Sequence, residues 1–406
     1  MIHLLKICKN LFIIAVLCQV FFSCKEDPIG QMPLDKTPPK PISNPVVTNV
    51  PGGAKIKYQL PDETDLLYVK AVFTLPNGTE QEVKTSVFFN TLEISGFGKS
   101  SKMTIPLITV DRSRNESEPV YVEIEPEDSP IYDICKSIEI VQGFGGFKIN
   151  WFNPMKTEVM IDILKKDEDG VFKYVETFYS SEPVANRAVR GQDPVESEYA
   201  VFVRDYYKNH TDTIYSTLTP WYEVQLDKSK FAALPKSSKF NLHSYGSSSM
   251  SIIWNDAIMP ENAIYYIADD QTPKLYWPYF AFDMGVKAKL SRFRFWSRGN
   301  AFIYSLHAPK EILLLGTNDW NVASNPESDD SEWQILIRCT SYRPSGLPPE
   351  EPPTDEDRAY HDAGQEFEFP LDAPAVRYVR FKSLGSWSGS YGLFVSELTF
   401  WGSPEN

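Results

Sequence analysis

Two large aromatic residues in a short run near the end of the chain carry the clearest potential for chemistry. Trp387 and Tyr391 enclose Ser388-Gly389-Ser390, between two predicted strands. A loop of small residues exposes its side chains, and two exposed rings there are difficult to explain by core packing. Aromatic faces stack on the C–H surfaces of sugars, and polar groups bond to sugar hydroxyls. The run is a candidate glycan-binding loop; the alternative is a packed loop that covers the mouth of a barrel.

A second candidate pair, Tyr342 and Arg343, precedes the turn Pro344-Ser345-Gly346 and offers a ring beside a guanidinium. Catalytic motifs are absent from the sequence: it contains no HExxH, no GxSxG and no phosphate-binding loop. A glycosidase needs two carboxylates at a defined separation in a cleft, and small β-domains leave no room for its usual barrel. We therefore expect a binding protein and not an enzyme.

The elements that position these residues are short alternating strands. In the run 291–298, Phe293 and Phe295 share one face while Arg292 and Arg294 share the other, the pattern of a half-buried strand. No sustained helical period occurs from about residue 229 onward, and we predict a jelly-roll or sandwich there. The Pro-rich acidic run 347–357 is predicted to be a mobile loop. The predicted strands are 290–296, 311–315, 333–339, 366–369, 377–382 and 393–401.

This last region resembles the discoidin, or coagulation factor type C, family of galactose-binding-like domains. The resemblance is carried in order by the following segments: WPYFAFDMG (277–285), LSRFRFWSR (290–298), PKEILLLGTND (309–319), GQEFEFPL (364–371), VRYVRFKSL (376–384) and VSELTFWG (395–402). It implies a β-sandwich that binds ligands in the loops at one end, in bacteria often a carbohydrate.

The resemblance also suggests further site residues. Arg298 ends its strand where sugar-binding relatives often carry an arginine, and a structural salt bridge is the alternative. His243 and Asn255 lie in the first loops, where relatives place a binding His or Asn. A lone histidine is more often structural, so neither residue is a strong signal by itself.

Relatives commonly hold a structural calcium ion, for which Asp269 or Asp270 together with Glu397 are the possible counterparts here. Calcium prefers such hard oxygen ligands. The usual Asp-Gly-Asn stretch of the family is replaced by Asn255-Asp256-Ala257. A solvated acidic turn is the simpler interpretation, and we expect no cofactor to be required.

An internal repeat precedes this region. Gly52-Gly53-Ala54-Lys55-Ile56 matches Gly145-Gly146-Phe147-Lys148-Ile149 at an offset of 93, and Asp111…Asn115 matches Asp205…Asn209 at an offset of 94. Each copy is predicted to contain a Gly-Gly turn, an alternating strand and a late Asp…Asn turn. The repeating unit has the size of an immunoglobulin-like sandwich. In the segments IKYQLPDETDLLYVKAVFT (56–74) and ITVDRSRNESEPVYVEIEP (108–126), the first copy resembles a fibronectin type III domain, and the second copy is a divergent version. Both are expected to be spacers.

The N-terminus resembles a bacterial lipoprotein signal. Lys6 and Lys9 precede a short apolar segment of about 18 Å, too short for a ~30 Å bilayer core. Ser23-Cys24 resembles a lipobox, and the following Lys25-Glu26-Asp27 resembles the signal that sends Bacteroidetes lipoproteins to the outer face of the outer membrane. We expect lipidation of Cys24; the alternative is an ordinary cysteine after a cleaved signal peptide.

The acidic composition suits a solvated surface protein. The formal net charge of −14 argues against nucleic acid, which requires concentrated Lys and Arg. Cys135 and Cys339 fall in different predicted domains, so we expect small buried side chains and not a disulfide.

Together these features predict an all-β protein. The whole layout, an anchor followed by two fibronectin-like domains and a discoidin-like end, resembles lipoproteins of Bacteroidetes polysaccharide-utilisation systems, which implies a surface-facing lipoprotein of the outer membrane. Its expected partners are an oligosaccharide or polysaccharide and an outer-membrane import complex. The alternative is an adhesion or protein-interaction role for the same loops. The predicted divisions are a signal peptide (1–23), a Pro-rich tether (24–45), two fibronectin III-like sandwiches (46–126 and 127–228) and a discoidin-like jelly-roll β-sandwich (229–406).

Overall fold

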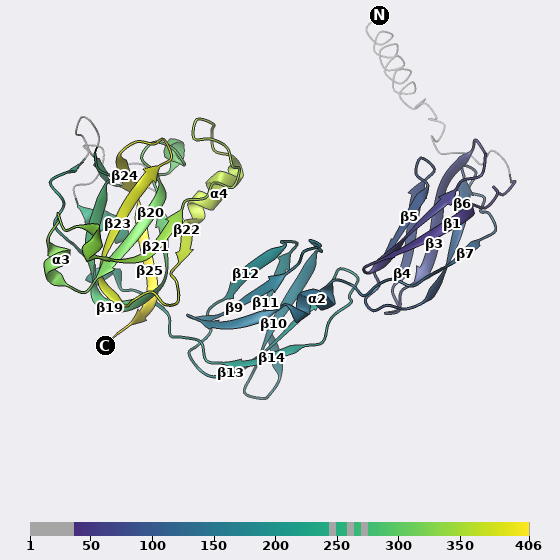
Figure 1. The fold of residues 1–406 in the computed structure, drawn as a ribbon, viewed down its shortest axis with the longest axis horizontal. Helices are drawn as coiled ribbons and strands as arrows, with labels where there is room; N and C mark the ends of the chain where they lie inside the picture. Colours follow the sequence, from purple (N-terminus) through teal and green to yellow (C-terminus); the bar gives the residue numbers. More distant parts are fainter. Residues whose placement is uncertain (1–35, 243–248, 258–263, 269–274, 406) are drawn as a thin grey trace, which may run out of the picture.

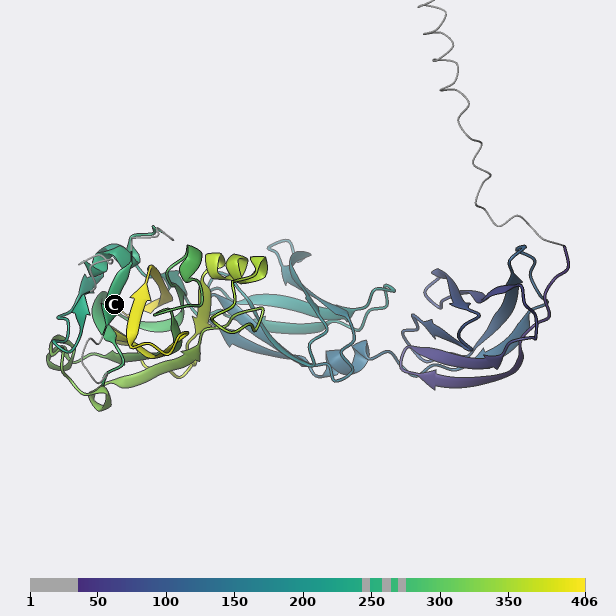
Figure 2. The ribbon, with the colours of Figure 1, turned by 90° about the horizontal axis from the view of Figure 1, so that it is seen from above.

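The chain forms three β-sandwich modules in a row, which confirms the predicted all-β sandwich fold (Figures 1 and 2). The computed structural model describes residues 36–242, 249–257, 264–268 and 275–405. Each module has its own hydrophobic core. The first module lies at one end of the row, the second in the middle and the third at the other end.

The first module packs the three-stranded sheet β1-β2-β5 against the four-stranded sheet β4-β3-β6-β7. Alternate residues of each strand point inward, and Ile56, Val69 and Ile105 are fully buried between the sheets. Its strands are β1 (Ser43–Val50), β2 (Gly53–Gln59), β3 (Leu66–Thr74), β4 (Glu80–Ser86), β5 (Thr91–Ser95), β6 (Met103–Asp111) and β7 (Val120–Ile124).

The second module repeats this plan with sheets β12-β9-β8 and β11-β10-β13-β14. A short helix, α2 (Ile131–Lys136), adds Ile131 and Ile134 to its core. The strands are β8 (Glu139–Gly143), β9 (Gly146–Phe152), β10 (Val159–Lys166), β11 (Phe172–Ser180), β12 (Val184–Val189), β13 (Ser197–Arg204) and β14 (Ile214–Leu218).

The structure explains why the Gly-Gly pair recurs. Gly52 and Gly145 have φ angles of +69° and +61°, in the left-handed region that favours glycine. At Gly53 and Gly146 a Cβ atom would lie 2.1 Å and 1.9 Å from the backbone oxygens of the facing strand. The two copies of the Gly-Gly pair therefore occupy equivalent places in the two modules.

The third module is a larger sandwich. An eight-stranded sheet contains the path β15-β25-β19-β23-β20-β21, with β16 and β22 also paired to β19, and it faces the sheet β17-β18-β24. Phe282, Phe293, Phe381 and Phe400 are fully buried in its core. Its strands are β15 (Val224–Gln225), β16 (Ala232–Ala233), β17 (Asn241–Leu242), β18 (Tyr265–Ala268), β19 (Tyr279–Trp296), β20 (Pro309–Thr317), β21 (Gln334–Thr340), β22 (Gln365–Glu368), β23 (Val376–Ser386), β24 (Gly392–Val395) and β25 (Glu397–Pro404).

Helical turns connect these strands at several points. They are η1 (Lys228–Lys230), η2 (Met250–Trp254), η3 (Asn300–Phe302), α3 (Trp320–Ser324), η4 (Asp330–Glu332) and α4 (Asp355–Ala363). The sequence analysis missed α4, which begins inside the Pro-rich acidic run. Thr354 caps it by accepting a hydrogen bond from the backbone N–H of Asp357.

Two strand predictions differ in detail from the structure. The segments 277–285 and 290–298 form one bent strand, β19, which changes register between Asp283 and Ala288 around Gly285 at φ +72°. The segment 393–401 is divided at Ser396 between β24 and β25, which belong to different sheets. Cys135 and Cys339 are unpaired and pack against the cores of different modules, but each is half-buried and not fully buried as the sequence predicted.

Candidate functional site

The loop that joins β23 to β24 carries the predicted aromatic residues and is held by hydroxyl groups. The Ser388 hydroxyl donates to the carbonyl of Leu306 at 2.7 Å, and the Ser390 hydroxyl lies 2.5 Å from His307 Nδ1. The segment 387–391 is thus fixed by a neighbouring loop, although its Gly/Ser composition predicted flexibility.

Trp387 is half-buried and more enclosed than the sequence predicted. Its indole N–H donates to the Ser341 hydroxyl at 3.2 Å, and its ring meets the Tyr304 ring edge-on at 5.1 Å. The Lys310 ammonium lies 4.8 Å from the ring centroid. These contacts give Trp387 a packing role, which is the alternative that the sequence left open for this loop.

Tyr391 takes part in a different arrangement. Its ring stacks on Trp277 with centroids 4.2 Å apart and an angle of 8° between the planes. Tyr276, next to Trp277, is 39% exposed. We call Tyr276, Trp277 and Tyr391 the aromatic rim. Trp277 and Tyr391 are half-buried, so each keeps part of its surface available to solvent.

Arg298 and Tyr342 are held by aromatic neighbours. The Arg298 guanidinium lies 3.6 Å from the centroid of Phe302, a ring that packs in the same cluster as Trp387. Tyr342 is 57% exposed and meets Tyr360 edge-on at 5.6 Å. The structure thus brings Arg298 near the Trp387 cluster and leaves Tyr342 on the surface.

Arg343 corrects the sequence prediction, because it is only 3% exposed and its donors are used internally. Its Nε donates to Asp357 at 2.9 Å. The remaining nitrogens donate to three backbone carbonyls in the run 347–357, those of Pro348, Glu351 and Pro352. Arg343 therefore organises the Pro-rich acidic run, which is not the unpacked loop that its composition predicted, and it is not accessible to a glycan.

Asp357 completes this buried pair. Burial by itself would raise the pKa of its carboxyl group, but hydrogen bonds from Ser345 and Arg343 outweigh burial and hold the pKa well below its usual range. The carboxylate therefore stays charged opposite the guanidinium at any physiological pH.

Glu397, the predicted calcium ligand, instead bonds to a lysine. It is 1% exposed, and its Oε1 accepts from the Lys228 ammonium at 2.6 Å. The same ammonium lies 2.6 Å from Asp256. Burial raises the pKa of Glu397 despite this partner. The Lys228 ammonium therefore supplies the positive charge between the carboxylates of Glu397 and Asp256.

Of the remaining predicted site residues, the structure describes Asn255. Asn255 ends η2, and its side chain accepts from the backbone N–H of Ala257 at 2.9 Å. His243, Asp269 and Asp270 lie outside the described residues. Within the described ranges, no group of three or more His, Cys, Asp or Glu residues is arranged to hold a metal ion.

Sequence reasoning missed Trp277, Tyr304 and His307. Trp277 was seen only as the first residue of a strand, and Tyr304 adopts a left-handed φ of +50°, which nothing in its sequence neighbourhood indicates. Trp277 meets Tyr391, Tyr304 meets Trp387 and His307 meets Ser390, and each of these partners lies more than 80 residues away in the sequence. Such long-range pairs leave no local signal.

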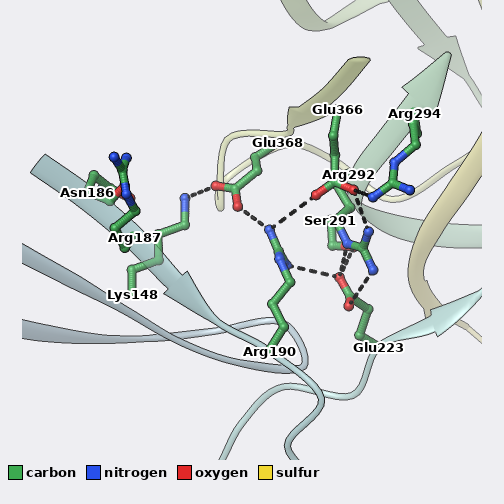
Figure 3. Close-up of polar contacts among 10 residues, drawn as sticks. All are labelled: Lys148, Asn186, Arg187, Arg190, Glu223, Ser291, Arg292, Arg294, Glu366 and Glu368. Atoms are coloured by element: carbon green, nitrogen blue, oxygen red, sulfur yellow. Dashed lines mark hydrogen bonds and ion pairs between the residues drawn. The ribbon is translucent and has the colours of Figure 1, made fainter. Parts of the chain in front are cut away.

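A charged cluster joins the second module to the third (Figure 3). We call it the ionic joint, and its members are Lys148, Arg190, Glu223, Ser291, Arg292, Arg294, Glu366 and Glu368. Arg190 contacts Glu368 and lies 3.6 Å from Glu223, and Lys148 also contacts Glu368. Arg292 binds Glu366 at 2.8 Å and Glu223 at 3.3 Å. Side chains of both modules thus converge on the carboxylates.

Backbone contacts reinforce this joint. Trp221 exchanges backbone hydrogen bonds with Gly143 and Gly145, each 2.8 Å long, and its ring meets Phe144 at 5.0 Å. Three residues later Val224 pairs with Gly402 of β25. Only Tyr222 and Glu223 separate the two attachments, so the linker has little freedom to act as a hinge.

Three family models together match most of the chain. DUF4959 matches residues 39–126, DUF5126 matches residues 127–229 and DUF5000 matches residues 254–402, and each is described as a domain of unknown function. No curated protein matches the sequence. Within the described part of the chain, no helix has the length and apolar character needed to cross a membrane.

Solved structures add a relative. The SusE-like protein BT2857 is 30% identical, and the match covers 68% of this chain and all of that protein, with a TM-score of 0.44. The C-terminal domain of a chitobiase from Bacteroides fragilis (12% identity, 45% of this chain, all of that chain, TM-score 0.28) also matches. So does a two-domain fibronectin type III segment of chicken tenascin (14% identity, 44% of this chain, 99% of that chain, TM-score 0.23).

Superpositions with such low TM-scores carry no argument about function. The 30% sequence identity over all of BT2857 does show the family: the chain belongs to the family of SusE-like proteins.

Proposed function

We propose that this SusE-like protein is a non-catalytic lipoprotein that binds glycan at the cell surface, and that the aromatic rim of its third module holds the sugar. The observation that carries the proposal is the Trp277–Tyr391 stack, a pair of half-exposed rings at 4.2 Å. A rigid aromatic surface beside polar groups is what recognition of a pyranose requires.

Nearby groups supply the polar part of the site. The hydroxyls of Ser388 and Ser390 belong to the same loop as Tyr391, and His307 lies against Ser390. Hydroxyls and imidazole both donate and accept, which matches the hydroxyl pattern of a sugar. Since the loop is already ordered, binding would cost little conformational entropy.

A glycan panel tests the rim directly. The soluble chain that begins at Lys25 would be compared with its Tyr391→Ala variant on an array of plant, host and bacterial glycans. We expect the variant to lose at least tenfold in affinity, because it removes one face of the stack. Trp320→Ala is the matched control: Trp320 is 54% exposed on the same module, but in α3, at the end of β20 remote from the aromatic rim.

The two outcomes are distinct. Loss of binding in Tyr391→Ala with retention in Trp320→Ala supports the rim. Equal binding by all three proteins would remove the rim from the proposal, and no binding by the parent chain would instead favour the adhesion role.

We also propose that Cys24 carries the lipid that anchors the protein to the outer membrane, facing the exterior. The support is the sequence from Ser23 to Asp27 together with the membership of the SusE-like family. Replacing Cys24 with alanine should release the protein from the membrane fraction, and protease accessibility in whole cells would report which face it occupies. A variant that stays in the outer membrane would overturn the anchor.

A further inference from the structure

The second module carries exposed aromatic rings that its expected role as a spacer does not explain. Tyr179 is 73% exposed and Tyr206 is 84% exposed. The two rings line one open groove of about 400 Å³, together with Met160, Ser180 and Ser181. Large side chains this exposed, gathered on one groove, mark a binding surface more often than a spacer.

Strand register explains how the groove is built. Met160 of β10 pairs with Tyr179 on β11 and with Arg204 on β13, so these three side chains share one face of the sheet. Arg204 lies against the Met160 sulfur at 2.9 Å. Its guanidinium binds Asp162 at 2.5 Å, and the Thr177 hydroxyl also donates to Asp162 at 2.5 Å.

The turn that carries Tyr206, on one side of the groove, is held in place by the first module. Tyr206 lies within the turn Asp205…Asn209, where Asp205 accepts from the backbone and the side-chain amide of Asn209. The next residue, Tyr207, bonds through its hydroxyl to Ser95 of the first module at 2.6 Å. The backbone position of Tyr206 is therefore set before any ligand arrives, which lowers the entropy cost of binding.

The first module lacks this chemistry at the equivalent place. There the residue before the repeated turn is Val110, which pairs with Tyr68, and Tyr68 pairs with Ser86. The Arg114 guanidinium lies 5.9 Å from the centroid of the Tyr68 ring and donates to its hydroxyl, so a cation covers the one aromatic residue of that row. The groove thus belongs to the second copy of the repeat alone, and the shared fold does not require it.

We propose that this tyrosine groove is a second binding site for a neutral oligosaccharide, which makes the protein bivalent for glycan; the inference rests on the proposed function. Tyr179 and Tyr206 would stack on sugar rings. The Ser180 and Ser181 hydroxyls and the part-exposed Arg204 would bond to sugar hydroxyls.

Charge selects the class of ligand. Glu158 is the one charged residue among those that line the groove, and the Arg204 cation is compensated by Asp162. An acidic glycan would meet a carboxylate and no free cation. A neutral glycan would instead use the Glu158 carboxylate as a hydrogen-bond acceptor for its hydroxyls.

Affinity gel electrophoresis of the soluble chain from Lys25 would test the groove, with amylopectin, xyloglucan and arabinoxylan as neutral probes and polygalacturonate as the acidic probe. The double variant Tyr179→Ala/Tyr206→Ala should weaken retardation by a neutral probe at least tenfold. The double variant Tyr179→Phe/Tyr206→Phe should retain most binding, because it keeps the stacking faces. Tyr121→Ala is the matched control, an exposed tyrosine (66%) on a sheet of the first module.

Parallel measurement of Tyr391→Ala separates this inference from the proposed function. If Tyr391→Ala abolishes retardation and the double alanine variant retains it, the groove is overturned while the aromatic rim stands. If the double alanine variant loses retardation and Tyr391→Ala retains it, the groove stands and the rim does not. A parent chain that none of the neutral probes retards, or stronger retardation by polygalacturonate, would overturn the groove as a site for neutral glycans. If the double alanine variant unfolds at the same temperature as the parent chain, misfolding does not explain its loss of binding.

Discussion

The two joints between modules are built from different chemistry. The first joint uses mainly uncharged groups: Asn209 donates to the carbonyl of Gly96 at 2.9 Å, and Asn77 donates to that of Tyr207 at 2.8 Å. The ionic joint between the second and third modules uses arginines and glutamates that are largely removed from solvent.

The difference shows that the second copy of the repeat is joined to its two neighbours in different ways. In the first module the Asp111…Asn115 turn meets the incoming chain, where the Asn115 amide donates to Thr37. In the second module the equivalent turn meets the preceding module through Asn209. The turn is thus a docking element at the N-terminal end of each copy, whereas the third module is attached through the ionic joint and the backbone contacts of Trp221 and Val224.

The largest expected effect is from Glu223→Ala in the ionic joint. The Glu223 side chain is 7% exposed and lies between Arg190 and Arg292. Its removal leaves the nearly buried Arg292 with one carboxylate fewer, and we expect a loss of about 3 kcal/mol in the free energy of unfolding. Calorimetry would measure it, with Glu93→Ala as the control at an exposed pair (Lys55–Glu93) that should cost less than about 0.5 kcal/mol. Equal effects would show that the joint is not specially stabilised.

Asn209→Ala should weaken the first joint by about 1–2 kcal/mol, because it removes the bond to Gly96 as well as the bonds within its turn. Asn115→Ala is the matched variant, since Asn115 makes the same bonds to Asp111 but donates to Thr37 of the incoming chain, away from the first joint. Spin-label distances across the first joint should broaden only for Asn209→Ala. Broadening in both variants would contradict a docking role for the turn.

Acidification should affect the two joints in opposite directions. Burial would raise the pKa of Glu366, but Arg292 and Arg294 hold it below its usual value, so its stabilising contribution is present above pH 4.5 and is lost as the pH falls through the lower folded value.

At the first joint, burial raises the pKa of Asp205. The folded state therefore binds this proton more tightly than the unfolded state does, and the contribution of Asp205 grows as the pH falls. Distances across the ionic joint should broaden below about pH 4.5 before those across the first joint do. The reverse order would show that other groups control the joints.

Salt should have the smallest effect. Glu368 is 32% exposed at its side chain and pairs with Arg190 and Lys148, which are 27% and 26% exposed. Screening of such part-exposed pairs is worth less than about 1 kcal/mol, so 1 M NaCl should slightly broaden distances across the ionic joint and leave the first joint unchanged. Glu368→Gln should remove most of this salt dependence, and a variant that keeps it would assign the dependence to Glu223 or Glu366.

Local sequence patterns predicted much of the fold. Alternation along 291–298 placed Phe293 and Phe295 in the core and the arginines on the other face, and the structure agrees. The same pattern could not show that Arg292 would face Glu223, because that carboxylate comes from the linker to another module.

Arg343 and Trp387 show why the candidate site was harder to predict. Their residue types fit sugar recognition, but Arg343 is buried by a run that wraps around it, and Trp387 is enclosed by Ser341 and Tyr304. Composition suggested that the run 347–357 would not pack. A single buried guanidinium that satisfies three of its carbonyls was enough to order it.

The sequence by itself determined the strands, the repeat and its glycines, because side-chain alternation and left-handed turns are local properties of the backbone. Only the tertiary structure decided which aromatic rings are accessible and which charges meet. Those outcomes depend on contacts between residues far apart in the chain, such as Trp277 with Tyr391 and Tyr207 with Ser95. A residue's type states what it can bind, and packing decides whether it is free to do so.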